Sequence, residues 1–148
     1  MSTKTFLAAL ALTVGASCAA FGQALPSGYP ATGDARATPA YEVLLLQKVA
    51  VETDLYDLRS RVTSDSDAFK ARRFELMAIT REMERLQTLE KSVVPKLTGT
   101  YGDLLLRKVT LEVRLNDLRS KVTAESQDYK RTRTELAILE REMESILK

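Results

Sequence analysis

The sequence contains no histidine, no tryptophan and only one cysteine, Cys18. Imidazole metal sites, histidine-based acid–base catalysis and disulfides within the chain are therefore excluded. A glycine-rich phosphate loop following a strand is also missing. We therefore expect that the protein is not an enzyme and that it uses no metal or other cofactor.

Charge of either sign is not in large excess, since 22 Lys and Arg stand against 20 Asp and Glu and the net charge is +2. This balance gives no strong attraction to nucleic acid. The 148 residues correspond to about one domain, and a composition that is 28% charged and 45% hydrophobic suits long helices.

Residues 1–24 have the layout of a secretory signal peptide. Lys4 precedes an apolar run over residues 6–20, and small residues follow it. We prefer cleavage after Ala24, with cleavage after Ala20 as the alternative. Membrane contact is expected only if this segment is retained as an anchor or if Cys18 carries a lipid. The protein is therefore expected to be exported, to the periplasm or the exterior of a bacterium.

Residues 25–40 contain three of the four prolines, Pro26, Pro30 and Pro39, and little apolar content. A segment of this composition cannot bury enough surface to order itself. We predict a disordered spacer over residues 25–40.

The rest of the chain is a tandem repeat. Residues 101–148 repeat residues 41–88 at a constant offset of 60, and 23 of the 48 aligned pairs are identical. Pro95 and Gly99 lie between the copies. We therefore divide this part into repeat 1 (residues 41–90), a linker (91–100) and repeat 2 (101–148).

Apolar residues recur every three or four positions in each copy, as they do along the contact seam of an amphipathic helix. Leu45, Leu46 and Val49, with their counterparts in repeat 2, widen the seam so that this end can contact more than one neighbour. The predicted seam contacts are Leu44, Val51, Leu55, Leu58 and Val62 in repeat 1, and Leu104, Leu111, Leu115, Leu118 and Val122 in repeat 2.

Lys48 and Lys108 stand at equivalent positions on this otherwise apolar seam. Each is either a selector of register or partner, or a long side chain that extends its ammonium group outward near Glu52 or Glu112.

A polar stretch in the middle of each copy predicts a turn. Arg59 and Arg61 suit the carboxyl end of one helix, and Asp65 and Asp67 suit the amino end of the next. Ser64 is a candidate helix cap, with Thr63 and Thr123 as alternatives. The expected fold is all-α, with two tandem helical hairpins forming a coiled coil or a small helical bundle. One unbroken helix per copy is the alternative, because the seam stays in register and no Gly or Pro forces a break.

Two basic clusters lie at the start of the second helix of each copy. They are candidate contacts for an anionic partner, although neighbouring acids can neutralise them. The clusters consist of Lys70, Arg72 and Arg73 in repeat 1, and Lys130, Arg131 and Arg133 in repeat 2.

Residues 111–144, and more loosely residues 51–84, resemble the periplasmic coiled-coil segment of the polysaccharide chain-length determinant (polysaccharide co-polymerase) proteins. The resemblance implies two heptad helices joined by a polar turn in a protein of the cell envelope. Where the family usually has His-Pro at the turn, this chain has Ser126-Gln127 and Ser66-Asp67.

Together these features predict an exported, non-enzymatic coiled-coil protein. It would act by helix–helix association, as a structural or interaction element of the bacterial cell envelope. Self-association or binding of another envelope protein is expected, without nucleic acid. The alternative is a periplasmic holdase-like or anionic-polymer-binding hairpin module that uses the basic clusters.

Overall fold

The computed structural model describes residues 33–148, which form four long helices and two short 3-10 helices. These described residues contain no strand, so their fold is all-α as expected. The elements in chain order are η1 (Ala35–Ala37), α1 (Pro39–Arg59), α2 (Asp67–Gln87), η2 (Val94–Lys96), α3 (Gly99–Lys121) and α4 (Gln127–Leu147).

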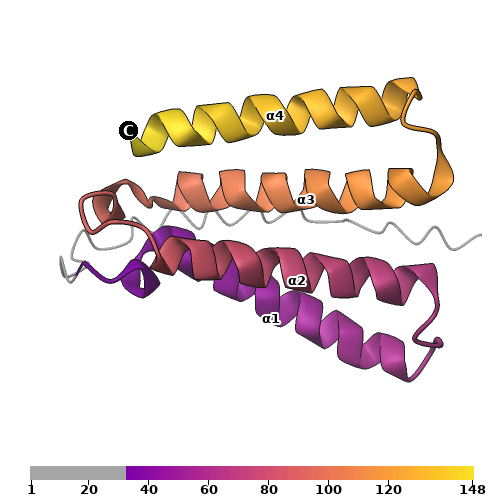
Figure 1. The fold of residues 1–148 in the computed structure, drawn as a ribbon. Helices are drawn as coiled ribbons and strands as arrows, with labels where there is room; N and C mark the ends of the chain where they lie inside the picture. Colours follow the sequence, from indigo (N-terminus) through magenta and orange to yellow (C-terminus); the bar gives the residue numbers. More distant parts are fainter. Residues whose placement is uncertain (1–32) are drawn as a thin grey trace, which may run out of the picture.

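The prediction of two helical hairpins is confirmed, and the alternative of one unbroken helix per copy is wrong. The chain turns between α1 and α2 and again between α3 and α4 (Figure 1). The caps differ from the expected Ser64, Thr63 and Thr123. Ser66 and Ser126 adopt an extended backbone, and each hydroxyl accepts a hydrogen bond at 3.2 Å from the backbone N–H three residues on. A serine placed in this way satisfies a helix amide that would otherwise lack a partner.

The prediction of a disordered spacer is wrong for residues 33–40. Thr38 caps α1 by accepting a hydrogen bond from the Tyr41 amide, and Pro39 is the first helical residue. Proline is favoured there because the first amide of a helix has no partner within it. Ala35 and Ala40 are buried. The predicted signal peptide, Cys18 and the start of the spacer lie outside the described residues.

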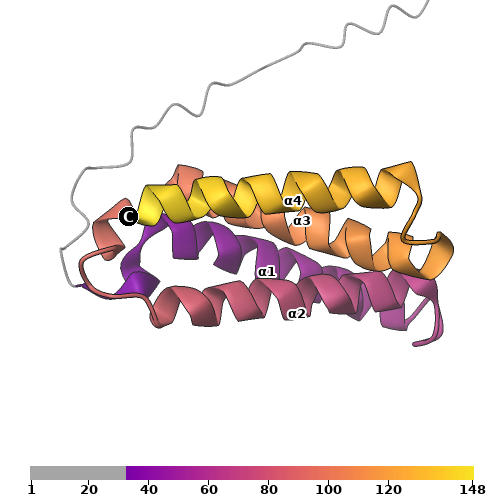
Figure 2. The same ribbon diagram turned by 45° about the horizontal axis from the view of Figure 1, so that its top comes forward.

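The two hairpins lie side by side, and α3 is in the middle of the assembly. It packs against α1, α2 and α4. Figures 1 and 2 show α4 on the outer side of α3, where it forms one edge of the structure. Both hairpin turns lie at one end, and the connection between the hairpins lies at the other (Figure 1).

One hydrophobic cluster runs through all four helices, and Leu44, Ile79, Leu105 and Met143 represent α1 to α4 in it. Helices α1 and α3 approach each other closely at Gly102 of α3. A Cβ atom there would lie 2.9 Å from the Cα atom of Ala40 and 2.9 Å from Cβ of Val43. Glycine at this position therefore lets the backbones of α1 and α3 come close together.

Candidate functional site

The buried charges in the described part of the chain lie between the hairpins, on α2 and α3. Lys108 Nζ lies 2.7 Å from Glu82 Oε1, and the two side chains are 8% and 1% exposed. Glu140 and Glu112 also approach this ammonium group, at 3.6 and 3.9 Å. Since an unpaired buried charge is costly, the pair fixes the position of α3 against α2.

A second layer of charge covers this pair. Arg81 forms an ion pair with Glu112 across the same interface and lies 3.7 Å from Glu82 Oε1. Arg85 Nη1 lies 3.7 Å from Glu82 Oε2, an oxygen that accepts no hydrogen bond within residues 33–148. We call this set of residues the ion network: Arg81, Glu82, Arg85, Lys108, Glu112 and Glu140.

Tyr101 lies within electrostatic reach of the ion network and belongs to the hydrophobic cluster. Burial raises the pKa of its phenol above the ordinary value of 10.0, because the phenolate would lose its hydration. Arg85 works against this rise, and Glu82 adds to it.

The predicted seam residues differ in burial along their length. Leu44, Val51, Leu55 and Leu111 are buried. Val122 is exposed because α3 ends at Lys121 and the chain is extended at Val122. The half-buried seam residues are Leu58, Val62, Leu104, Leu115 and Leu118.

The widened part of the seam differs in burial between the two repeats. Leu105 and Val109 of α3 are buried. Leu106 is half-buried. The three counterparts on α1 face solvent: Leu45 is 43% exposed, Leu46 66% and Val49 53%. We call Leu45, Leu46 and Val49 the α1 stripe. Exposed apolar groups that adjoin one another in this way are typical of interaction surfaces.

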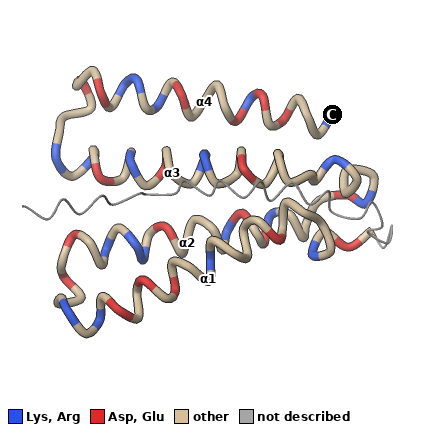
Figure 3. The backbone as a smooth tube through the Cα atoms, turned by 180° about the vertical axis from the view of Figure 1, so that it is seen from behind, with Lys and Arg blue, Asp and Glu red and all other residues tan. Residues whose placement is uncertain are grey.

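The basic clusters are largely paired with nearby acids. Lys70 lies 3.8 Å from Asp65, and Arg72 pairs with Asp54 and Glu75. In repeat 2, Lys130 pairs with Glu125, and Arg131 with Glu135. Arg73 and Arg133 are exposed, and no carboxylate of residues 33–148 lies within ion-pair distance of either. Figure 3 shows positive and negative residues interspersed along α2 and α4.

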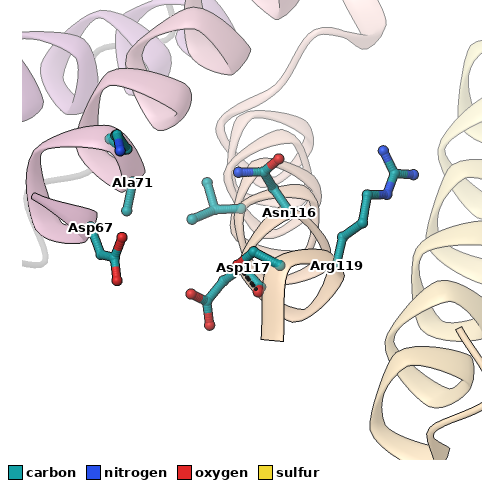
Figure 4. Close-up of a pocket in the computed structure, with 8 residues that line it drawn as sticks. Asp67, Ala71, Asn116, Asp117 and Arg119 are labelled. Atoms are coloured by element: carbon teal, nitrogen blue, oxygen red, sulfur yellow. Dashed lines mark hydrogen bonds between the residues drawn. The ribbon is translucent and has the colours of Figure 1, made fainter. Parts of the chain in front are cut away.

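The groove beside the start of α2 and the end of α3 is open and is lined by both polar and apolar groups (Figure 4). It has a volume of about 460 Å³ and includes Asp67, Lys70, Asn116 and Asp117 in its lining. Asp117 lies 2.7 Å from Lys121, and this hydrogen bond raises the pKa of the Lys121 ammonium group. Arg119 points away from Asp67 (Figure 4). The groove therefore does not bring Arg119 and Asp67 toward a common point.

The sequence analysis singled out Lys108 but did not identify its partner Glu82. It also missed Gly102, for which a signal was present: glycine stands where repeat 1 has Glu42. A glycine inside an otherwise regular helical pattern often indicates a close backbone approach.

Comparison with protein-family models, with curated proteins and with solved structures finds no match. Among residues 33–148, no helix combines the length and the apolar character that a membrane span needs.

Proposed function

We propose that this protein is an exported, non-enzymatic element of the bacterial cell envelope that acts by helix–helix association. The observation that carries the proposal is the α1 stripe, because three large apolar side chains on one helix face solvent together. Burying them against a partner helix removes apolar surface from water, which is the main favourable term in most associations. The layout of residues 1–24 supports export, and the resemblance to chain-length determinant proteins supports an envelope coiled coil.

The charged groups support a non-enzymatic role without a cofactor. Acids and bases pair along and between the helices, as Lys108 does with Glu82 and Arg72 does with Glu75. Catalysis by a charged side chain needs that group aimed at a substrate position, within hydrogen-bond reach of the reacting proton. Within residues 33–148, many of the acids and bases are paired with one another in this way.

Binding of an anionic polymer, or holding of clients by the basic clusters, is the second candidate. Arg73 and Arg133 favour it, because they are exposed and form no ion pair with a carboxylate of residues 33–148. The pairing of Lys70, Arg72, Lys130 and Arg131 with acids lowers the positive potential that such a partner would meet. Interspersed charge of both signs likewise disfavours nucleic acid.

A photo-crosslinking amino acid at position 46 tests the proposal in intact cells. Leu46 is the most exposed residue of the α1 stripe. We expect irradiation to give a discrete protein product of higher mass, whatever the partner. The matched control carries the crosslinker at Arg133, an exposed polar position on the side of α4 opposite Glu142, and should give no such product. Absence of a product at position 46 would refute association through the α1 stripe.

The two candidates respond differently to salt. Association through the α1 stripe should persist when salt is raised, because burial of apolar surface is not screened. Binding of an acidic polymer should weaken steeply. Changing all six cluster residues to glutamine should leave the crosslink at position 46 intact and should abolish polymer binding.

A further inference from the structure

The two repeats are related by a stacking operation and not by a two-fold axis. A two-fold axis would make α1 contact α4 as extensively as α2 contacts α3. Instead, α3 packs on both helices of repeat 1, whereas α4 packs mainly on α3 (Figure 1). Stacking of this kind leaves one open face on each outer side. An interface between unlike faces can then be repeated by a further copy.

The open face of repeat 1 carries the residues that repeat 2 uses to pack on its neighbour. The α1 stripe, Leu45, Leu46 and Val49, corresponds to Leu105, Leu106 and Val109 of α3. Gly102 and Val109 lie seven residues apart, on one side of α3, and Gly102 abuts Ala40 and Val43 of α1. The side of α3 that meets repeat 1 is therefore the side that α1 leaves exposed.

The open face of α4 matches the face of α2 that receives α3. Ala78, Glu82 and Leu86 are buried on α2. Their counterparts on α4 are exposed: Ile138 is 54% and Ile146 42% exposed, and Glu142 lies between them. The spacing of four residues places all three on one side of the helix.

The charges on the two open faces are complementary and repeat four of the six members of the ion network, since Arg85 and Glu140 have the uncharged counterparts Ser145 and Thr80. Lys108 and Glu82 correspond to Lys48 and Glu142, and Glu112 and Arg81 correspond to Glu52 and Arg141. All four positions are identical in the two repeats, although only 23 of the 48 aligned pairs are. Lys48 now pairs with Glu52 in its own helix, at 3.2 Å.

We propose that a second copy of this chain docks head to tail, with the α1 stripe of one copy against Ile138 and Ile146 of the next. Lys48 of one copy then pairs with Glu142 of the other, as Lys108 pairs with Glu82 within the chain. This inference rests on the proposed function and names its partner. Because the interface joins unlike faces, further copies add at both ends unless the rotation closes a ring.

The intermolecular interface departs from the internal one at the start of α1. In the intermolecular interface, Glu42 of one copy takes the place that Gly102 has in the internal interface. Asp103 of the other copy takes the place of Val43, which Gly102 contacts. Two carboxylates meet at this end, so the intermolecular contact is looser than the internal one. The double variant Glu42→Gly, Asp103→Val copies the internal interface and should associate more strongly than the natural chain.

Charge reversal with mixing tests the proposal on the purified full chain by analytical ultracentrifugation. Lys48→Glu and Glu142→Lys should each weaken self-association about tenfold or more, because each places like charges together. An equimolar mixture should recover association, because Lys48 of one variant meets Glu142 of the other. Arg133→Glu is the control: it lies nine residues from Glu142, on the opposite side of α4, and should associate like the natural chain.

Several results would overturn the head-to-tail arrangement. These are a natural chain that stays monomeric, single variants that associate normally, or a mixture that fails to recover. An effect of Lys48→Glu without an effect of Glu142→Lys would indicate two-fold pairing of the α1 stripe with itself. In each case the crosslinking experiment at position 46 tests the proposed function separately: a crosslinked product supports it, and the absence of one refutes it. Circular dichroism confirms that the variants remain helical.

Discussion

Replacing Lys108 by methionine should cost more stability than any other single change to the charged residues. The variant leaves Glu82 1% exposed and without the ammonium group that now lies 2.7 Å away. Removing one partner of a buried ion pair costs about 3–5 kcal/mol. Arg81 and Arg85, each 3.7 Å from a Glu82 oxygen, offset part of this loss, so we expect about 3 kcal/mol. A loss of this size is a large fraction of the ~5–15 kcal/mol that stabilises a typical domain.

Urea unfolding followed by circular dichroism measures this loss, and repeat 1 provides a matched control. Lys48 occupies the equivalent position, and its pair with Glu52 is partly exposed. Lys48→Met should therefore change the free energy of unfolding by less than about 1 kcal/mol. The double variant Glu82→Leu, Lys108→Met removes both charges and should recover most of the loss. Equal effects of Lys108→Met and Lys48→Met would refute the reasoning.

Two further predictions concern the interface between the hairpins. Gly102→Ala should destabilise the fold by about 1–3 kcal/mol, because the new methyl group would lie 2.9 Å from the Ala40 backbone. Gly99→Ala, where the nearest atom is 3.9 Å away, should be tolerated in the same unfolding assay. The raised pKa of Tyr101 means that the unfolded chain loses its phenol proton first as the pH rises. The free energy of unfolding should therefore fall above pH 10.0, and less steeply in Tyr101→Phe.

The helical content and the hairpins could be predicted from sequence because the signals are local. The spacing of Leu44, Val51 and Leu55 indicates one side of a helix, and all three are buried. The polar stretch after Val62 indicates a turn, although the hydroxyl that caps α2 belongs to Ser66. Thr38 followed by Pro39 is a helix start by the same local logic. Counting Pro39 among the prolines of the spacer extended the predicted spacer too far.

The different environments of the two copies could not be predicted from local pattern. Lys48 and Lys108 have similar neighbours in sequence, and each has a glutamate four residues on. One is partly exposed and the other is buried because repeat 2 has repeat 1 beside it, whereas no element of the described chain covers the same side of α1. The burial of these lysines depends on which repeat packs beside them, and the spacing of apolar residues in the sequence does not contain that information. On the side of α3 that packs against repeat 1, Gly102 replaces the Glu42 of repeat 1, and this difference indicates close packing.

The buried pair defines register more than it adds stability. A buried ion pair often contributes no more than well-packed apolar residues of similar size. Separating the two charges of the pair is nevertheless costly. Sliding α3 along α2 by one turn, about 5.4 Å, would bring Lys108 opposite Ala78 or Leu86 in place of Glu82. Glu82 and Lys108 would then lose each other and keep only the more distant Arg85 and Glu112 of their own helices, whereas the apolar residues alone would tolerate the shift. The same discrimination applies to Lys48 and Glu142 at the open faces, where it would select one docking position among several apolar ones.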